Sequence, residues 1–475
     1  MEFRLVYPEL LTTALAFGVL VLSILVPRER RIALNYASVL GLAAVLAVLV
    51  GMLGVNDSLL DGMYVVDGFA TYFKILVVIS AIMVSLISPG YTGKFMPDST
   101  SEYNSVLLFA VLGMMLLVSA GDLITLYTSL ELMTISFIAL VGFGTFLRKA
   151  PEAAVKYILL SALSSALLLY GLTLVFGLSG STLFTDIALY VKTKHVLEPL
   201  MLMGLVFILA GFAFKVSAVP FHMWTPDVYD GAPTTITAFL SVASKGAGFA
   251  VLLRLFMRVF TDTQVWMPVV VVIAALSILL GNYVAIPQTN IKRLMAYSGI
   301  AQAGYILLGL VAYTRAGLES AIFYAMLYVF CNLGAFAVIT VMGEALESDE
   351  IEDYAGLWKR SPLMAATMLI CLLSLAGIPP LAGFYGKFYL FTAAMEQGYL
   401  WLVIVALGMS MVSVYYYLMV AKVMYYFDPK EDQPIPVPLA ARIVMVAAVL
   451  ITIFIGVYPD PLTDVAVTVA KTFLP

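Results

Sequence analysis

The chain has 475 residues, of which 63% are hydrophobic and only 11% are charged, and its mean hydropathy is +1.03. A soluble domain carries about 25% charged residues, so this composition excludes a soluble globular protein and indicates an integral membrane protein. The formal net charge of -4 is spread over short loops and gives no indication of a nucleic-acid partner.

Apolar stretches long enough to cross a bilayer, about 20 residues each, occur fourteen times along the chain. They lie at residues 6–26, 32–54, 69–88, 104–120, 123–146, 154–177, 197–219, 233–257, 266–286, 295–313, 318–343, 362–396, 399–426 and 440–458. Acidic residues, Glu2 and Glu9, flank the first stretch and no small-residue cleavage site follows it, so we expect a retained helix and not a signal peptide. The sequence therefore predicts an all-α polytopic membrane protein whose loops are too short for a catalytic domain.

Basic residues in the loops and near the ends of the predicted spans indicate the orientation in the membrane. Twelve lie on the side of the first loop and seven on the side of the N-terminus, so both termini are expected to face outward by the positive-inside rule. The twelve are Arg28, Arg30, Arg31, Lys94, Arg148, Lys149, Lys292, Arg293, Lys359, Arg360, Lys430 and Arg442.

The seventh and twelfth spans are interrupted by proline and glycine. Pro220, Pro226 and Pro233 follow the seventh span, and Pro379 and Pro380 interrupt the twelfth. Proline removes a helical hydrogen bond and clashes with the preceding turn, so both spans should be broken. The two breaks are an odd number of spans apart, so the two broken helices run in opposite directions, as in an inverted repeat.

The chain is accordingly divided into four parts. Residues 1–103 form helices 1–3, residues 104–260 a first repeat of helices 4–8, residues 261–427 a second, inverted repeat of helices 9–13, and residues 428–475 helix 14.

Four ionisable side chains lie deep in these spans: Glu131, Lys215, Lys245 and Lys387. A charge at mid-membrane costs about 2.5–3.5 kcal/mol on insertion scales, so such residues usually pair and mark an ion path. Desolvation disfavours a lysine ammonium and a nearby carboxylate favours it, so forming and breaking a Glu–Lys pair can load and discharge a proton. We expect Glu131 to pair with Lys215, Lys245 to relay, and Lys387 to exchange protons with the far side.

Other polar residues allow two interpretations. Lys156 is near the start of its span and can either snorkel to the surface or take part in the path. Lys74 and Lys422 are expected at the membrane interface, and Tyr415, Tyr416 and Tyr417 are expected to pack or lie at an interface. Asp227 and Asp230 can mark an entrance or simply form a turn.

The numbers of cysteine and histidine exclude an iron–sulfur centre in this chain. A cluster needs about four thiolate or imidazole ligands, and the chain has only Cys331, Cys371, His195 and His222, far apart in sequence. A bis-histidine haem is formally possible, but His195 lies in a polar loop. We expect both cysteines to be buried as small hydrophobic residues. Without a redox centre in the chain, the energy for transport is expected to come from a partner or from another ion gradient.

Three long segments resemble the antiporter-like membrane subunits of respiratory complex I. They are FKVSAVPFHMWTPDVYDGAPT, NIKRLMAYSGIAQAGY and LAGIPPLAGFYGKF, and the VYDGAPT continuation is similar to subunit N in particular. The resemblance covers essentially the whole chain. It implies that Glu131, Lys215, Lys245 and Lys387 correspond to the acid and lysines of the family's proton path, with Lys156 as a further position. Gln302 stands where relatives often carry histidine, and glutamine cannot take up a proton near pH 7, so water would have to bridge Lys245 and Lys387.

The resemblance also implies a multi-pass subunit of the cell inner (plasma) membrane within an NADH-quinone oxidoreductase. NADH, FMN, iron–sulfur clusters and quinone would then be bound by partner subunits, and none of them by this chain. The expected partners are the antiporter-like subunits L and M, the small subunits K, J, A and H, the hydrophilic redox arm, and lipids. A subunit of a multi-subunit Na⁺/H⁺ antiporter, and a packing subunit with vestigial charges, are the alternatives.

Overall fold

The computed structural model of the chain describes residues 2–27, 31–97, 99–144, 147–194, 198–431 and 433–474, with the backbone alone for Glu2. Arg28, Arg30 and His195, which entered the sequence interpretation, lie outside the described residues.

The structure is built almost entirely from helices, and in the described residues twelve helical runs are long and apolar enough to cross a membrane. The first six are η1 (Glu2–Val6) continued by α1 (Tyr7–Leu25), then α2 (Ile32–Gly51), α3 (Gly68–Phe95), α4 (Thr100–Val118), α5 (Leu123–Gly142) and α6 (Ala150–Ser179). The seventh is one continuous run of four elements: α10 (Thr234–Phe239), η4 (Leu240–Ser244), α11 (Lys245–Arg254) and η5 (Leu255–Val259). The last five are α12 (Thr263–Ala285), α13 (Ile291–Ala312), α14 (Arg315–Leu346), α18 (Leu400–Tyr426) and α19 (Leu439–Val457).

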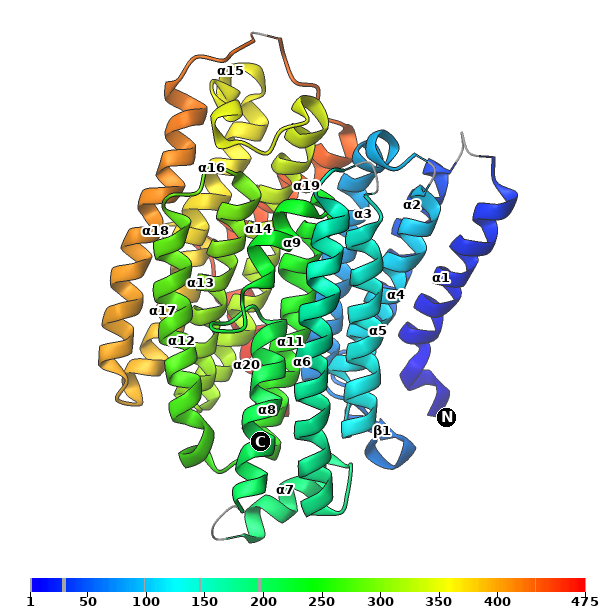
Figure 1. Ribbon diagram of the computed structural model, residues 1–475, viewed down its shortest axis with the longest axis vertical. Helices are drawn as coiled ribbons and strands as arrows, with labels where there is room; N and C mark the ends of the chain where they lie inside the picture. Colours follow the sequence, from blue (N-terminus) through cyan, green and yellow to red (C-terminus); the bar gives the residue numbers. More distant parts are fainter. Residues whose placement is uncertain are drawn as a thin grey trace.

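Two further spans are each made of two short helices, as the proline pattern predicts. The first consists of α8 (Pro199–Lys215) and α9 (Trp224–Gly231), and the second of α16 (Pro362–Ala376) and α17 (Ala382–Glu396). In Figure 1, α8 rises from the lower end and α16 descends from the upper end, so the two broken spans run in opposite directions. The fourteen predicted spans and the two breaks are confirmed. The division into repeats at residues 104–260 and 261–427 stays a prediction.

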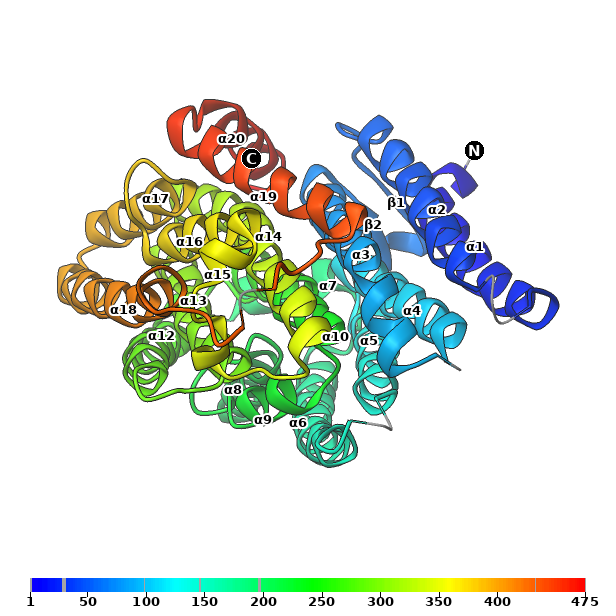
Figure 2. The ribbon, with the colours of Figure 1, turned by 90° about the horizontal axis from the view of Figure 1, so that it is seen from above.

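The most buried helices lie at the centre of the bundle. The most apolar window of the run from Thr234 to Val259 is entirely buried, and those of α13 and α14 are buried over 94% of their residues, whereas those of α1, α2 and α18 are buried over only 33%. Figure 2 shows α1 and α2 at one end of the molecule and α18 at the other. Small residues permit the close central packing: a Cβ on Gly281 of α12 would lie 2.5 Å from the backbone nitrogen of Ala301 on α13. The central helices are therefore sealed from lipid.

Several smaller elements were not expected from the sequence. They are the hairpin of β1 (Asp57–Leu59) and β2 (Tyr64–Val66) with η3 (Leu60–Gly62) between its strands, and the helices α7 (Phe184–Thr193), η6 (Ile351–Tyr354), α15 (Leu357–Arg360) and α20 (Asp460–Phe473). In α20 the buried residues are Ala466, Val469, Ala470 and Phe473, which is the i, i+3, i+4, i+7 spacing of an amphipathic helix.

The loops at the upper end of Figure 1 are joined by ion pairs. Lys94 pairs with Glu347 at 2.7 Å, and Lys430 pairs with Asp353 at 2.7 Å. These pairs connect loops that are far apart in sequence and place their basic residues at one end, which we call the first-loop end. The arrangement agrees with the charge asymmetry on which the predicted orientation rests.

Candidate functional site

Lys215 is the last residue of α8, at the first break. The helix ends there because Val216 and Ser217 leave the helical conformation ahead of Pro220. The ammonium of Lys215 is buried and donates a hydrogen bond of 2.5 Å to the hydroxyl of Thr134 on α5. The C-terminus of a helix carries partial negative charge, so this position favours a cation.

Glu131 lies one turn before Thr134 on α5 and is half-buried. Its Oε1 accepts a hydrogen bond of 2.5 Å from the hydroxyl of Ser165 on α6. Among the described residues Glu131 has no ion pair within 4.0 Å, so the expected direct contact with Lys215 is not formed. Because residues three apart share a helix face, Thr134 instead holds Lys215 beside Glu131 on α5.

Lys245 is only 3% exposed and lies near the middle of the run α10–η5. The π-helical turn η4 directly precedes it, and such turns are frequent at functional sites. Its Nζ has no hydrogen-bond partner among the described residues and lies 5.7 Å from the centre of the Tyr229 ring. The helix that carries Lys245 packs against the first break. A Cβ on Gly248, three residues after Lys245, would lie 3.6 Å from the Cβ of Lys215.

A small cavity of about 10 Å³ lies against Lys245 and is lined also by Gln302 and Tyr328. The Tyr328 hydroxyl likewise lacks a hydrogen-bond partner in the described part of the chain. Gly299 leaves room for both groups, because a Cβ there would lie 2.7 Å from Lys245 Nζ and 3.4 Å from the Tyr328 hydroxyl. Two unpaired polar groups and a space of this size suit one bridging water.

Gln302 extends from this cavity towards the second break. Its amide Nε2 donates a hydrogen bond of 3.1 Å to the carbonyl of Leu375, and its Oε1 accepts one from the Tyr324 hydroxyl. The next carbonyl along α16, that of Ala376, accepts a hydrogen bond of 2.9 Å from Lys387 Nζ. Gln302 therefore lies between Lys245 and Lys387.

Lys387 is buried in α17 and reaches back across the break to the C-terminus of α16. Its Nζ also donates to the hydroxyl of Ser410 on α18 at 2.9 Å and lies 4.6 Å from the centre of the Tyr305 ring. Both lysines are thus associated with the C-terminus of the first half-helix of a broken span: Lys215 is the last residue of α8, and the Lys387 ammonium binds the last carbonyl of α16. A helix C-terminus has unpaired carbonyls as well as its dipole, so both breaks are built to accept a cation.

Lys156 reaches the first-loop end of the bundle, as the snorkelling interpretation expects. Its side chain is 42% exposed and forms ion pairs of 2.8 Å with Glu152 on its own helix and with Asp227 on α9. Arg293 also pairs with Asp227, at 3.1 Å. Lys156 is not in contact with the four deep residues, and its role in a path remains a prediction.

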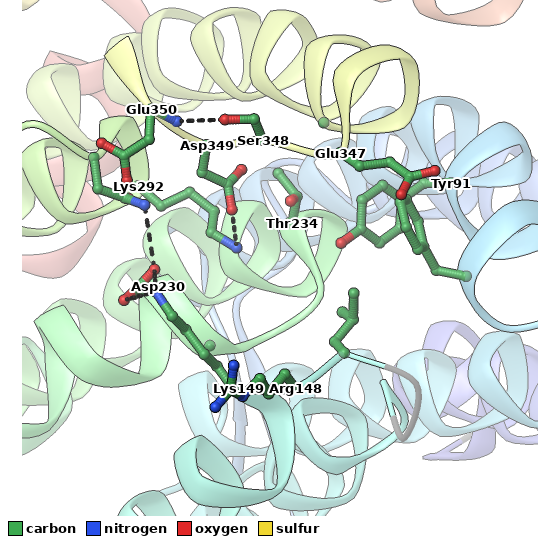
Figure 3. Close-up of a pocket in the computed structure, with 15 residues that line it drawn as sticks. Tyr91, Arg148, Lys149, Asp230, Thr234, Lys292, Glu347, Ser348, Asp349 and Glu350 are labelled. Atoms are coloured by element: carbon green, nitrogen blue, oxygen red, sulfur yellow. Dashed lines mark hydrogen bonds and ion pairs between the residues drawn. The ribbon is translucent and has the colours of Figure 1, made fainter. Parts of the chain in front are cut away.

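A polar pocket of about 330 Å³ opens beside this ion-pair cluster (Figure 3). Asp230 lines it and pairs with Lys149 at 3.0 Å, and Lys292 pairs with Asp349 at 3.0 Å. Lys292 is only 3% exposed and also donates to the carbonyl of Ala232 just ahead of α10. The sequence interpretation missed this buried lysine, because its neighbour Arg293 made the pair look like an ordinary basic loop.

Lys74 was expected at the membrane interface, and this prediction is wrong. Its side chain is 1% exposed, pairs with Glu9 of α1 at 2.8 Å and donates to the Tyr64 hydroxyl at 2.7 Å. The expectation failed because Glu9 appeared to be a flanking charge, whereas α1 carries it against α3. Of the tyrosine run, Tyr415 is exposed, and Tyr416 and Tyr417 are buried.

Within the described residues, no group of three or more His, Cys, Asp or Glu side chains could hold a metal ion. Cys331 and Cys371 are both free and buried, as expected.

The family model described as "NADH:quinone oxidoreductase/Mrp antiporter, TM" matches residues 120–413. The chain is 54% identical to NADH-quinone oxidoreductase subunit N of Desulforamulus reducens, covering 100% of this chain and 99% of the relative, and 52% identical to that of Moorella thermoacetica, covering 99% of each.

Two solved structures with the same fold come from different complexes. A chain of respiratory complex I from Thermus thermophilus with bound Aureothin is 33% identical, covers 97% of this chain and 99% of its own length, and gives a TM-score of 0.83. A chain of the Mrp complex from Dietzia sp. DQ12-45-1b gives a TM-score of 0.88 at 20% identity, covering 100% of this chain and 98% of its own length. At that identity the second likeness concerns the fold alone.

Proposed function

Because this chain belongs to the NADH-quinone oxidoreductase subunit N family and is a membrane subunit of complex I, we propose that it translocates protons through its buried charged residues. The path runs from Glu131 and Lys215 at the first break, through Lys245 and a water at Gln302, to Lys387 at the second break. Quinone reduction elsewhere in the complex drives it.

The observation that carries this proposal is the position of Gln302. It lines the cavity of Lys245, and its amide donates to the carbonyl adjacent to the one that binds Lys387. Glutamine does not titrate near neutral pH. It can, however, orient a water in the cavity of Lys245, and further water would then carry the proton past Gln302 to Lys387.

Each residue of the path has a physical role in this scheme. When Glu131 approaches Lys215, the charge pair stabilises the ammonium; when it withdraws, the buried ammonium loses that stabilisation and gives its proton to the next site. Lys245 has no competing hydrogen bond, so it can receive a proton without first breaking a contact. Lys387 holds the proton between Ala376 and Ser410 until it leaves on the side of the N-terminus.

The pocket of Figure 3 is the proposed access route from the first-loop end, which is then the cytoplasmic face of the bacterial inner membrane. NADH, FMN, iron–sulfur clusters and quinone are bound by partner subunits in this scheme. The partners are subunits L, M, K, J, A and H and the hydrophilic arm. The identity of 54% to subunit N over the whole chain favours this assignment over a Na⁺/H⁺ antiporter subunit, with which the likeness concerns the fold alone.

Replacement of Lys245 by Met tests the proposal, since methionine keeps most of the length of the side chain without its charge. In the intact complex reconstituted in vesicles, we expect Lys245→Met to lower the rate of proton translocation at least tenfold while the complex still assembles. Lys422→Met is the matched control, because Lys422 lies exposed on α18. Undiminished translocation by the Lys245→Met complex would refute the proposed path.

A further inference from the structure

A crevice of about 520 Å³ opens at the first-loop end between α12, α13 and α18, and it adjoins the pocket of Figure 3, with which it shares the lining residue Glu350. Its mouth is polar, with Gln288 and Thr289 after α12, and with Glu350 and Glu352 from the segment that follows α14. Its wall on α18 includes Val420, and Tyr416 lies one turn deeper. Tyr416 is ten residues before the end of α18, so the crevice reaches about 15 Å into the bundle at 1.5 Å per residue.

Buried polar groups continue inward from the bottom of the crevice. The Tyr416 hydroxyl donates to Asn282 Oδ1 at 3.1 Å, and Asn282 Nδ2 donates to the Tyr305 hydroxyl at 3.1 Å. The Tyr305 ring faces Lys387, whose Nζ lies 4.6 Å from the ring centre. The three residues Tyr416, Asn282 and Tyr305 are at most 2% exposed, and they come from α18, α12 and α13.

From this arrangement we propose that the crevice is a second water-access route, which leads from the first-loop end to Lys387, and that Tyr416, Asn282 and Tyr305 form its gate. The inference rests on the proposed function, because the route leads to Lys387, the last residue of the proposed proton path. Its physical basis is that a buried polar group is retained only where a hydrogen bond satisfies it, and these three satisfy one another in a line between the crevice and the lysine.

The gate is closed in the structure. A side-chain amide does not pass a proton on as a hydroxyl or water does, so Asn282 interrupts proton transfer along this line. Conduction requires the Tyr416 hydroxyl to leave Asn282 and water to take its place. Ser410, a direct partner of Lys387, lies on the same helix as Tyr416, so a movement of α18 would change both ends of the gate together.

Thiol labelling of the intact complex in membrane vesicles tests whether water fills the crevice. Met419→Cys should react with a membrane-impermeant thiosulfonate added at the first-loop end at least tenfold faster than Ile404→Cys, because Met419 lines the crevice and is 42% exposed. Ile404 lies on the same helix and is 60% exposed, on the outer surface of the bundle. The unsubstituted chain, whose two cysteines are buried, gives the background, and labelling is read on this subunit by mass spectrometry. Equal rates for the two variants would show a crevice filled with lipid and would overturn the proposal.

A second pair of variants tests the gate. Ser410→Cys should react slowly from the first-loop end, and adding Tyr416→Ala should raise its rate at least fivefold. Adding Tyr426→Ala, at a position that is 81% exposed on the same helix and does not line the crevice, should leave the rate unchanged. A rate that does not respond to Tyr416→Ala would rule out the gate.

The labelling result is separable from the test of the proposed function. If Met419→Cys is unreactive while Lys245→Met abolishes translocation, the second route fails and the proposed function stands. If Lys245→Met translocates protons normally, the proposed function fails, and with it the assignment of the crevice to the path, even where Met419→Cys reacts.

Discussion

Buried charges in this protein are stabilised by different means at different positions. Lys215 and Lys387 have hydroxyl partners and lie at helix C-termini, whereas Lys245 has neither and faces a small cavity. A charge at membrane depth is expensive, so the two well-coordinated sites suit the holding of a proton and the uncoordinated one suits its transfer. This contrast leads to two predictions at the scale of single residues.

Removal of the Thr134 hydroxyl should weaken the Lys215 site. Thr134→Val keeps the side-chain shape but deprives Lys215 of its hydrogen bond. A hydrogen bond to a charged group contributes about 1.5–3 kcal/mol. If the activation free energy of proton translocation rises by this amount, the translocation rate falls about ten- to hundredfold. Thr134→Ser restores the hydroxyl and should retain most of the activity. The measurement is the proton-translocation rate of reconstituted complex, and equal rates for the Val and Ser variants would contradict the role of this contact.

A methyl group at Gly299 should displace the Lys245 ammonium. The Cβ of Gly299→Ala would lie 2.7 Å from Nζ and would fill the cavity shared with Tyr328. Overpacking of this kind costs about 1–3 kcal/mol, and we expect translocation to fall several-fold in a complex that still assembles. Gly408→Ala is the control, because nothing lies within 4 Å of its Cβ. Normal translocation by Gly299→Ala would show that the cavity is not used.

At the scale of helices, the sequence was a good guide wherever local chemistry decides the structure. Prolines at Pro220 and Pro379–Pro380 predicted both breaks, and both are present. The lysines beside them were found because an ionisable residue in an apolar run is conspicuous. Their partners were not predictable, because Thr134, Ser165 and Ser410 are ordinary hydroxyl residues whose meaning depends on which helices become neighbours.

The same limit explains the wrong expectation for Lys74. Its distance from the end of its predicted span suggested snorkelling, and nothing local indicates that α1 brings Glu9 to within 2.8 Å of it. Likewise, the direct pairing of Glu131 with Lys215 was a reasonable expectation from charge alone, but the structure places Thr134 at that contact.

The beginning of α3 is fixed by a buried ion pair that makes stability depend on pH. Asp67 caps α3 and accepts hydrogen bonds of 2.8 and 3.0 Å from the Arg254 guanidinium. Burial acts to raise the pKa of Asp67, but the Arg254 charge and the Ala70 N–H together hold it below its usual range. Because the folded pKa is the lower one, the pair stabilises the protein above the unfolded value of about 3.9, and this stability is lost as the pH falls through the folded pKa.

Asp67→Asn should therefore destabilise the protein at pH 7. Removal of one partner of a buried ion pair lowers the free energy of unfolding by about 3–5 kcal/mol. The thermal unfolding midpoint of the purified membrane arm should therefore fall. The control Asp464→Asn, at an exposed position, should leave it unchanged. The difference between Asp67→Asn and the unsubstituted protein should shrink as the pH is lowered below about 4. A difference that is constant from pH 7 to pH 3 would contradict the assigned ion pair.

At the scale of the whole molecule, the deep residues form one line across the bundle, from α5 and α8 through α11 and α13 to α17. The helices that carry the middle of this line are the most buried of the bundle, while α1, α2 and α18 present the largest apolar surfaces. The interior thus isolates the charges from lipid, and the two breaks supply helix termini inside the bundle. The fold is shared with a chain of the Mrp complex from Dietzia sp., so the fold alone does not distinguish the two kinds of protein.

The central claim is that Lys245 and Lys387 are connected through water held at Gln302. A structure of the whole assembly at a resolution that shows ordered water tests it most directly. We predict density for a water in the cavity lined by Lys245, Gln302 and Tyr328, within hydrogen-bonding distance of Lys245 Nζ. A dry cavity, with the Lys245 ammonium sealed in apolar packing, would contradict the account.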